Sequence, residues 1–347
     1  MSKSHHRSVW WSWLISVLAV VGLGLGLGTV PAAASPFTAP QAPLDPAALA
    51  GQVGPQVVNI NTKFGYNNAV GAGTGIVIDP NGVVLTNNHV ISGATDISAF
   101  DVGNGQTYAV DVVGYDRSQD VAVLQLRGAA GLPTAAIGGG VSVGEPVVAM
   151  GNAGGQGGTP SAVSGKVIAL NQSVSATDTL TGANESLGGL IQADTPIRPG
   201  DSGGPMVNNA GQVVGMNTAA TDNYKMSGGQ GFAIPIGRAM GVAGQIRSGA
   251  GSNTVHIGPT AFLGLGVTDN GNGARVERVV NTGPAGAAGI APGDVITGID
   301  SVPISGATSM TDVLVPHHPG DTIAVHYRAA AGGDRTVNVT LAEGPPA

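Results

Sequence analysis

The sequence predicts a mostly β protein that consists of one large domain and one smaller domain. The chain has 347 residues, which is enough for two domains of about 150 residues each. Short runs rich in Val and Ile recur along it, and each is bounded by Gly, Pro, Asn or Asp, as is typical of strands. Its 58 glycines and 22 prolines follow no three-residue period, which excludes collagen and indicates many tight turns.

Composition and charge exclude several classes of protein. The chain is 42% apolar and only 10% charged, so it is neither a disordered acidic tail nor a coiled coil. Its 14 basic and 21 acidic residues give a net charge of −7, and the basic residues form no stripe, so we expect no nucleic-acid partner. Because the sequence contains no cysteine, disulfides, thiolate zinc sites and a cysteine nucleophile are excluded. Any catalysis must therefore use oxygen or nitrogen side chains, and we expect no cofactor and no metal.

The first 34 residues have the pattern of a secretory signal peptide. Lys3 and Arg7 precede an apolar run over residues 9–28, and Ala32 and Ala34 then provide an A-x-A cleavage pattern. We expect cleavage after Ala34 and a secreted or cell-envelope location for the rest of the chain. The alternative is an uncleaved membrane anchor, because about 20 apolar residues can just span a bilayer.

The rest of the chain divides into a lead-in, a large β domain, a linker and a second domain. Residues 35–43 are rich in Pro and Ala and predict a flexible lead-in, whereas residues 248–257 predict a linker rich in Gly and Ser. Residues 44–247 form the expected β domain, and residues 258–345 form the second domain. The strands expected in the β domain are 57–60, 75–78, 83–86, 121–126, 147–150, 166–170, 206–207 and 213–216.

Two segments of the large domain resemble each other. Residues 75–85 and 204–215 each contain an apolar strand led by Gly, a polar turn that ends in Gly, and a second apolar strand. Two similar hairpins suggest two similar β-units, which fits an all-β barrel or sandwich. One short helix is expected over residues 236–246, because its apolar residues recur at helical spacing.

Residues 200–205, Gly-Asp-Ser-Gly-Gly-Pro, are the most specific motif in the chain. Attack on an acyl carbon needs a hydroxyl on a tight turn, with backbone N–H groups near the oxygen that becomes negative. Flanking glycines allow such a turn and a close approach of the substrate carbonyl. We therefore predict that Ser202 is the nucleophile and that the N–H groups of Gly200 and Ser202 form an oxyanion hole. A plain Gly-rich turn is the structural alternative.

The same motif also satisfies G-x-S-x-G, the pattern of α/β-hydrolases such as esterases. In that fold the serine follows a parallel strand and a helix begins directly after it. Here Pro205 and a β-hairpin follow instead, and strands do not alternate with long helices. An esterase is therefore a second hypothesis, and a chaperone-like peptide-binding protein with little turnover is a third.

A serine nucleophile needs a base, and His89 is the strongest candidate. Among the histidines beyond the leader, it alone directly follows a strongly patterned strand, 83–86, of the large domain. An acid must then hold the imidazole in one tautomer. We choose Asp120, because it lies at the start of the apolar strand 121–126 and an acid in that position needs a partner. Asp116 is the reserve choice.

The order His, Asp, Ser with these neighbours resembles that of the chymotrypsin-like serine proteases. Residues 86–90, 120–124, 200–205 and 231–235 more narrowly resemble the HtrA family. The resemblance implies two six-stranded antiparallel β-barrels of the trypsin-like fold, with the base and acid from the first barrel and the serine from the second. It also implies a serine endopeptidase that cleaves partly unfolded proteins or peptides, and members of the family are often homotrimers.

This chain departs from the family in the turn that carries the serine, where Asp201 and Arg198 stand at positions usually occupied by Asn. Trypsin-like enzymes that cleave after Lys or Arg have an Asp six residues before the serine, where this chain has Pro196. The resemblance implies instead a small aliphatic P1 residue such as Val or Ala. The residues expected to form the pocket walls are Pro196, Ile197, Met216, Asn217, Thr218, Phe232, Ala233 and Ile234.

Residues 262–265 and 283–296 of the second domain resemble a PDZ domain. The resemblance implies that Phe262, Leu263, Gly264 and Leu265 form a carboxylate loop, whose backbone N–H groups receive the C-terminus of a peptide that extends the sheet. A short helix over residues 285–288 and a strand over residues 295–299 are expected as well. The alternative is a stabilising β-rich module without a ligand.

Several weaker patterns are assigned to structure. Residues 269–273 lack the spaced acids of an EF-hand and predict a hairpin turn instead of a calcium site. The glycine-rich stretches 71–75 and 151–158 lack a phosphate-binding lysine and a following helix, so we expect turns there. The remaining histidines are expected to be surface or core residues; they are His256, His317, His318 and His326.

Overall fold

The computed structural model describes residues 45–66, 68–177, 184–218, 230–280 and 282–347. The predicted signal peptide, 1–34, and the predicted lead-in, 35–43, lie outside these residues. In the described part of the chain, the longest helix has 12 residues, and none is long and apolar enough to cross a membrane.

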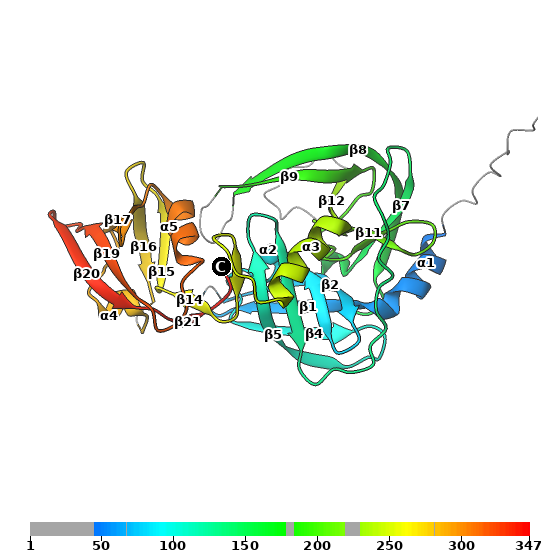
Figure 1. Ribbon diagram of the computed structural model, residues 1–347, viewed down its shortest axis with the longest axis horizontal. Helices are drawn as coiled ribbons and strands as arrows, with labels where there is room; N and C mark the ends of the chain where they lie inside the picture. The colour runs from blue at the N-terminus through cyan, green and yellow to red at the C-terminus, as the bar shows by residue number, and fades with distance from the viewer. Residues whose placement is uncertain (1–44, 67, 178–183, 219–229, 281) are drawn as a thin grey trace, which may run out of the picture. The chain divides into compact units, whose positions relative to one another are not determined.

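Six antiparallel strands close the first barrel (Figure 1). They are β1 (Val57–Phe64), β2 (Ala69–Asp79), β3 (Val83–Thr86), β4 (Asp96–Asp101), β5 (Thr107–Asp116) and β6 (Val121–Leu126). The strand order is β5-β4-β1-β2-β3-β6, and β6 pairs again with β5. A further strand, β13 (Val255–Ile257), pairs with β5 from outside the barrel. Because β3 and β6 are buried along almost their whole length, the residues that follow β3 and precede β6 are held on a rigid support.

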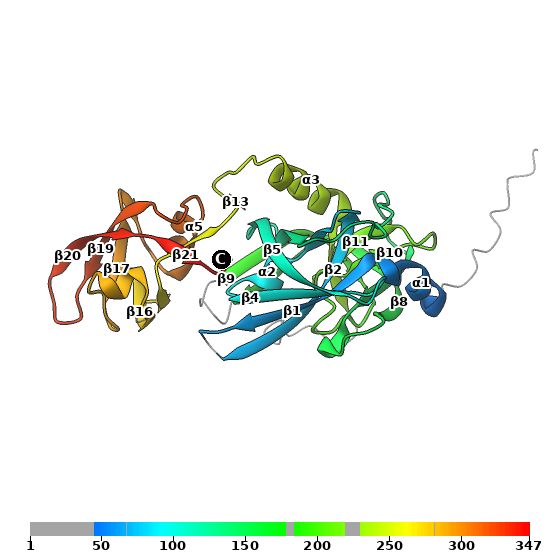
Figure 2. The same cartoon turned by 90° about the horizontal axis from the view of Figure 1, so that it is seen from below.

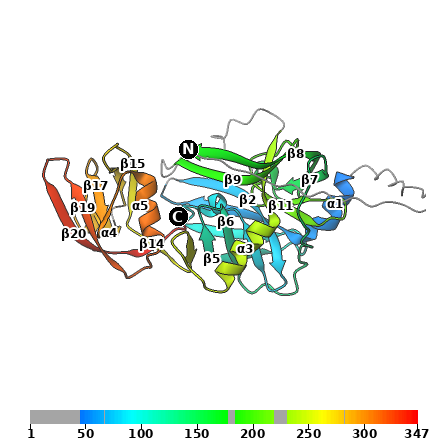
Figure 3. The same ribbon diagram turned by 45° about the horizontal axis from the view of Figure 1, so that its top comes forward.

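A second closed barrel contains β7 (Pro146–Gly151), β8 (Ser161–Thr177), β9 (Asn184–Ala193), β10 (Pro205–Val207), β11 (Val213–Asn217) and β12 (Gly231–Pro235). Its order is β10-β11-β12-β9-β8-β7, and all neighbours are antiparallel. The strands β8 and β9 lie side by side as a long hairpin (Figures 1 and 3). The two predicted six-stranded barrels are therefore confirmed.

Few helices accompany the barrels. The helix α1 (Pro46–Val53) was not predicted; Asp45 caps it by accepting hydrogen bonds from the N–H groups of Ala47 and Ala48, and it packs beside β8 (Figure 2). The predicted helix is α3 (Ile236–Arg247), which contacts β5 and β6 of the first barrel and β11 and β12 of the second. The short segments are η1 (Gly54–Gln56), α2 (Asn88–Ile91) and η2 (Ala153–Gly155).

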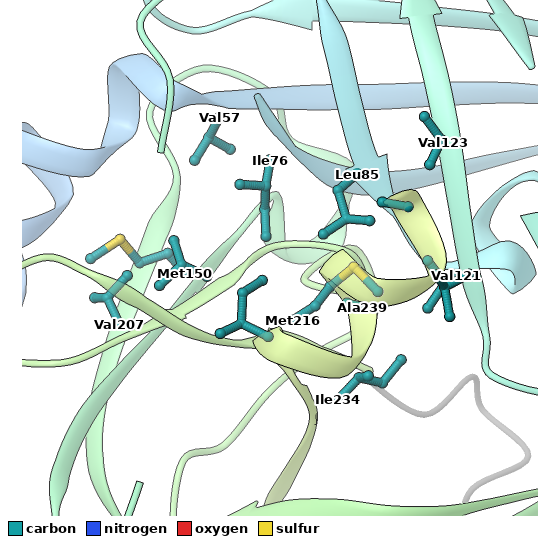
Figure 4. Close-up of a cluster of buried hydrophobic side chains, with 14 of the residues drawn as sticks. Val57, Ile76, Leu85, Val121, Val123, Met150, Val207, Met216, Ile234 and Ala239 are labelled. Carbon is teal, nitrogen blue, oxygen red and sulfur yellow. The ribbon is translucent and has the colours of Figure 1, made fainter. Parts of the chain in front are cut away.

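One cluster of buried side chains joins the two barrels (Figure 4). Ile76 and Leu85 enter it from β2 and β3, Met150 and Met216 from β7 and β11, and Ala239 from α3; all five are fully buried. Burial of a large apolar side chain stabilises a fold by about 1.5–3 kcal/mol. The cluster therefore fixes the two barrels against each other, and with them the loops that carry the predicted site.

The rest of the chain forms an α+β unit with a separate core. Its main sheet has the order β15-β16-β17-β19-β20, with β18 paired to β17, while β14 pairs with β21. The elements are β14 (Thr260–Phe262), β15 (Leu265–Asp269), β16 (Ala274–Val279), α4 (Pro284–Ala287), β17 (Val295–Ile299), β18 (Val302–Pro303), α5 (Ala307–Leu314), β19 (Thr322–Arg328), β20 (Asp334–Thr340) and β21 (Ala342–Gly344). Residues 270–273 form the predicted hairpin turn.

Candidate active site

His89 lies in α2, directly after the buried strand β3. Its side chain keeps 26% of its surface exposed, so the ring is held on the barrel yet reaches solvent. The backbone N–H of His89 donates to Asp120 Oδ1 at 3.0 Å. Asp120 therefore holds His89 by its backbone, in addition to any contact with the ring.

Asp120 lies at the end of a tight turn before β6. Its backbone has a φ of 53°, a left-handed conformation that Asp tolerates better than most residues. The N–H of Asp120 donates to the Arg117 carbonyl at 3.2 Å, and Asn87 Nδ2 donates to the Asp120 carbonyl at 3.0 Å. The turn thus holds the carboxyl group beside α2.

The three predicted catalytic side chains lie in contact with one another. His89 Nδ1 lies 3.0 and 2.9 Å from the two carboxyl oxygens of Asp120, and His89 Nε2 lies 2.9 Å from Ser202 Oγ. Because a carboxylate only accepts hydrogen bonds, the proton of a neutral imidazole belongs on Nδ1. The lone pair of Nε2 then faces the Ser202 hydroxyl, as general-base chemistry requires.

Two glycines shape the turn that carries Ser202. Gly200 and Gly203 have φ values of 97° and 81°, which side chains other than glycine rarely adopt. A Cβ on Gly203 would collide with the Thr74 carbonyl and with Thr86 Oγ1. The Gly203 N–H donates to the Asn217 carbonyl at 2.8 Å, which ties the turn to the end of β11. The backbone therefore needs glycine at both positions.

The Gly200 N–H, predicted to serve in the oxyanion hole, is oriented by its own peptide unit. The Pro199 carbonyl of that unit accepts a hydrogen bond from the Gly154 N–H at 2.7 Å. In a trans peptide the C=O and N–H point in opposite directions, so the Gly200 N–H faces away from Gly154. Among the described residues it meets no hydrogen-bond acceptor, which leaves it available for a substrate oxygen.

Asp201, the residue before the predicted nucleophile, is only 3% exposed. Its Oδ2 accepts a hydrogen bond from the Arg198 N–H at 2.9 Å, and its Oδ1 lies 3.2 Å from Ser161 Oγ. Burial raises the pKa of this carboxyl group, and the hydrogen bonds from Arg198 and Ser161 only partly offset that effect. A neutral side chain is therefore better suited to this position than a charged one.

Sequence reasoning missed two threonines that support the site. Thr218 donates from Oγ1 to Asp120 Oδ2 at 3.1 Å, although it was expected in the pocket wall. Thr74 donates from Oγ1 to the Gly200 carbonyl at 2.7 Å. The sequence carries no signal for either role, because each threonine binds a residue that is distant in the sequence and belongs to the other barrel. Asp116, the reserve acid, accepts hydrogen bonds from Ser118 and Gln119 in its own turn.

Half of the residues predicted to line the substrate pocket have no exposed surface, and that part of the prediction was wrong. Met216 and Ile234 point into the core between the barrels, and Ala233 points into the core of the second barrel. Asn217 is also buried and donates from Nδ2 to the Met150 carbonyl at 3.0 Å. Successive residues of a strand face opposite sides, so neighbours in β11 and β12 cannot all line one pocket. The residues that keep more surface are Pro196, Ile197 and Phe232, with Thr218 at 8%.

The predicted carboxylate loop runs from the end of β14 to the start of β15. The Leu263 carbonyl accepts from the Ala285 N–H at 2.9 Å, and the Gly264 carbonyl accepts from the Val280 N–H at 2.9 Å. The N–H groups of the same two peptide units, those of Gly264 and Leu265, therefore point the other way. Phe262 is half-buried, whereas Leu263 is 2% exposed and packs in the core of the α+β unit.

The candidate site contains no cluster of metal ligands. Across the described ranges, no group of three His, Cys, Asp or Glu side chains is arranged to hold a metal ion. Both oxygens of Asp120 and both ring nitrogens of His89 already take part in the chain of hydrogen bonds that ends at Ser202. What the arrangement supports is proton transfer away from an attacking hydroxyl.

Sequence profiles of known families match two parts of the chain. The profile of the trypsin-like peptidase domain matches residues 73–216, and that of the PDZ domain matches residues 261–341. Together with two closed barrels and the His-Asp-Ser contacts, these matches define a trypsin-like serine protease with a C-terminal PDZ domain.

Individual relatives define the family more closely. The chain is 35% identical to serine protease PepD of Mycobacterium tuberculosis, over 93% of this chain and 76% of that protein. It is 30% identical to serine protease Do-like HtrA of Lactobacillus helveticus, over 76% of this chain and 67% of that one. A probable periplasmic serine endoprotease, DegP-like, of Pseudomonas savastanoi is 36% identical over 67% of this chain, which covers 48% of that protein. The chain belongs to the HtrA family of serine proteases.

A solved structure of the same family has a similar fold. The HtrA-type protease AlgW, solved with a decapeptide, matches 88% of this chain and 100% of its own, with a TM-score of 0.50 and 26% identity. The predicted fold class, two trypsin-like barrels followed by a PDZ domain, is therefore confirmed.

Proposed function

We propose that this protein is a secreted endopeptidase that cleaves partly unfolded proteins or peptides after small aliphatic residues, with Ser202 as the nucleophile. The observation that carries the proposal is the separation of 2.9 Å between His89 Nε2 and Ser202 Oγ, with Asp120 on the other side of the ring. This is hydrogen-bond distance, so proton transfer needs no rearrangement of either side chain.

In the proposed mechanism, the Ser202 hydroxyl attacks the carbonyl carbon of the scissile peptide bond while His89 Nε2 takes its proton. The imidazolium that forms is stabilised by the Asp120 carboxylate. His89 then gives the proton to the leaving amine, and the acyl group remains on Ser202 Oγ. Water repeats the sequence with His89 as base, which releases the acid and restores the serine.

The tetrahedral intermediate carries a negative oxygen, which we assign to the backbone N–H groups of Gly200 and Ser202. Support comes from the Pro199 carbonyl, which accepts a hydrogen bond from the Gly154 N–H and so turns the Gly200 N–H away from Gly154. Removal of one such donor typically lowers kcat by about 10²–10³-fold. The conformation of Gly200 therefore has a direct effect on the rate.

The preference for an aliphatic P1 residue is argued from the carboxylates near the site. Pro196 occupies the position where basic-specific enzymes have Asp. Asp194 and Asp201 lie close in sequence, but the first accepts a hydrogen bond from the Lys166 N–H, and the second is buried and accepts one from the Arg198 N–H. A P1 Arg would therefore lack the carboxylate that basic-specific enzymes have at the position of Pro196. Discrimination among small aliphatic residues amounts to only about 1–3 kcal/mol. Peptides with P1 Val or Ala should be cleaved faster than a matched P1 Arg peptide.

We assign residues 258–345 to a PDZ domain that binds peptide C-termini, and residues 44–247 to the protease domain. The support is the turn at Phe262–Leu265, where the N–H groups of Gly264 and Leu265 point away from Ala285 and Val280, which donate to the carbonyls of Leu263 and Gly264. Secretion is supported by the pattern of residues 1–34, and one relative is named as periplasmic.

The experiment that tests the proposal is active-site labelling with a fluorophosphonate, followed by peptide mapping. We expect the label on Ser202, and Ser202→Ala should lose both labelling and proteolysis. The matched control is Ser164→Ala, an exposed serine on β8, which should keep both. Full proteolysis by Ser202→Ala would refute the nucleophile. A folded wild type without any turnover would favour the chaperone hypothesis, and turnover of esters but not of peptide amides would favour the esterase.

A further inference from the structure

Thr74 is a fully buried residue of β2 whose hydroxyl and backbone contact the nucleophile turn. Its N–H donates to the Ser202 carbonyl at 2.8 Å, and its Oγ1 donates to the Gly200 carbonyl at 2.7 Å. The same Oγ1 accepts a hydrogen bond from the Asn152 N–H at 2.9 Å. The Thr74 carbonyl in turn accepts from Thr86 Oγ1 at 2.7 Å. One residue of the first barrel thus binds both predicted oxyanion residues, which belong to the second.

We propose that Thr74 is a positioning residue for the oxyanion hole, which acts by holding the Gly200 carbonyl so that the Gly200 N–H stays directed at the substrate. The inference rests on the proposed function, since it assumes that Ser202 is the nucleophile and that Gly200 supplies a donor. Thr74 itself does not touch the reacting atoms.

The need for such a residue follows from the conformation of Gly200. Glycine moves between positive and negative φ more readily than any other residue, so the peptide units on both sides of Gly200 can rotate unless they are held. The unit before Gly200 is held by Gly154, which donates to the Pro199 carbonyl. The unit after it is held at both ends, by Thr74 Oγ1 at the Gly200 carbonyl and by the Arg198 carbonyl, which accepts from the Asp201 N–H at 3.0 Å. Loss of the Thr74 bond therefore leaves the unit after Gly200 held at its Asp201 N–H alone, and Gly200 is the residue whose N–H we assign, with that of Ser202, to the substrate oxygen.

A hydroxyl is needed because it both donates and accepts. Valine has the shape of threonine but would leave the Gly200 carbonyl and the Asn152 N–H without a partner in a buried place. Serine keeps the hydroxyl and removes only the methyl group. The chain also offers a matched control in Thr62 of β1, which is buried to a similar extent but whose Oγ1 has no hydrogen-bond partner.

The test compares Thr74→Val, Thr74→Ser and Thr62→Val by steady-state kinetics on a fluorogenic peptide amide with Val at P1. We expect Thr74→Val to lower kcat by about 10–100-fold with KM changed by less than about twofold, because an oxyanion interaction acts in the transition state. Thr74→Ser should keep kcat within about threefold of the wild type, and Thr62→Val within about twofold. The rate of fluorophosphonate labelling should fall in parallel with kcat.

Two results would overturn the inference. One is a Thr74→Val enzyme with kcat within about threefold of the wild type, and the other is a Thr74→Ser enzyme that is as impaired as Thr74→Val. If circular dichroism shows that Thr74→Val is unfolded, the pair Thr74→Ala and Thr74→Ser replaces it, because these two differ only in the hydroxyl; equal kcat values would then refute the role. An inactive Ser202→Ala beside a fully active Thr74→Val would defeat this inference alone, whereas an active Ser202→Ala would defeat the proposed function.

Discussion

Replacement of Asp201 by Asn should stabilise this protein at neutral pH, although it removes an acid beside the nucleophile. The carboxyl group is 3% exposed, and no Lys, Arg or His nitrogen forms an ion pair with it among the described residues. Its oxygens face the Arg198 N–H and Ser161 Oγ, and the Arg198 side chain, which is exposed, is the charged group that acts on it. Burial therefore dominates, and the pKa of Asp201 is raised.

The hydrogen bonds around Asp201 also favour a neutral side chain. Ser161 Oγ lies 3.2 Å from Asp201 Oδ1 and 3.1 Å from the Gly151 carbonyl, and a hydroxyl has only one proton for these two acceptors. With Asn at position 201, the amide donates to Ser161, Ser161 donates to Gly151, and the amide oxygen still accepts from Arg198. Both hydrogen bonds of Ser161 then have one donor and one acceptor, and the charge is absent from the buried site.

The sign of the pH dependence follows from the raised pKa. A carboxyl group whose pKa is higher in the folded than in the unfolded state contributes stability below its unfolded pKa of about 3.9, and that contribution is lost as the pH rises through the folded value. The Asp201→Asn variant has no carboxyl group at this position, so it does not lose this stability as the pH rises. Asp201→Asn should therefore match the wild type near about pH 4 and exceed it by about 1–3 kcal/mol near about pH 8, the usual cost of an imperfectly paired buried polar group.

The assay is urea denaturation between these two pH values, with both proteins in a Ser202→Ala background so that they do not digest their own unfolded chains. Asp194→Asn is the control, because Asp194 is exposed and should change stability by less than about 0.5 kcal/mol at every pH. The reasoning is refuted if Asp201→Asn is less stable than its parent at the higher pH, or if the difference between them does not vary with pH.

Three further substitutions separate the parts of the structure. Gly203→Ala should abolish turnover in a peptidase assay, because the added Cβ would collide with the Thr74 carbonyl. Gly139→Ala is the control and should keep full activity, because a Cβ at that position would meet open space. Thr218→Val should lower kcat by about tenfold through loss of the bond to Asp120, and recovery in Thr218→Ser would show that the hydroxyl is responsible. Leu124→Ala should lower the free energy of unfolding by about 2–5 kcal/mol, because Leu124 is fully buried in the core of the first barrel. The kcat of the folded enzyme should stay unchanged. A kcat that falls together with the stability would contradict the view that this core residue does not affect the site.

The strands that could be predicted are those whose apolar residues form short unbroken runs. Residues 83–86, 121–126 and 295–299 were predicted with the bounds that the structure has. The strands β4, β5 and β9 were missed, and β5 alternates exposed and partly buried residues over most of its length. A strand that is half exposed carries a weaker signal, because its polar face resembles a loop.

The helix α1 was missed although its signal is present in the sequence. Asp45 followed by Pro46 is a capping residue followed by a proline in the first turn, which together indicate a helix start. The contacts among Ser202, His89 and Asp120 could be predicted because the immediate neighbours of these residues in the sequence are specific. Their supports could not, because Thr74 and Thr218 are recognised only by which carbonyl or carboxylate they face after folding.

The two similar hairpins explain why the site forms where the barrels meet. The hairpin β2–β3 carries Thr74 in its first strand and is followed by His89, whereas the hairpin β10–β11 is preceded by Ser202 and followed by Thr218. Each hairpin therefore brings one proposed reacting group and one supporting threonine. Each threonine binds across to the other unit: Thr74 contacts the turn that carries Ser202, and Thr218 contacts Asp120, the partner of His89. Neither barrel holds a complete site, so the buried cluster that joins them is a requirement of the chemistry as well as of the fold.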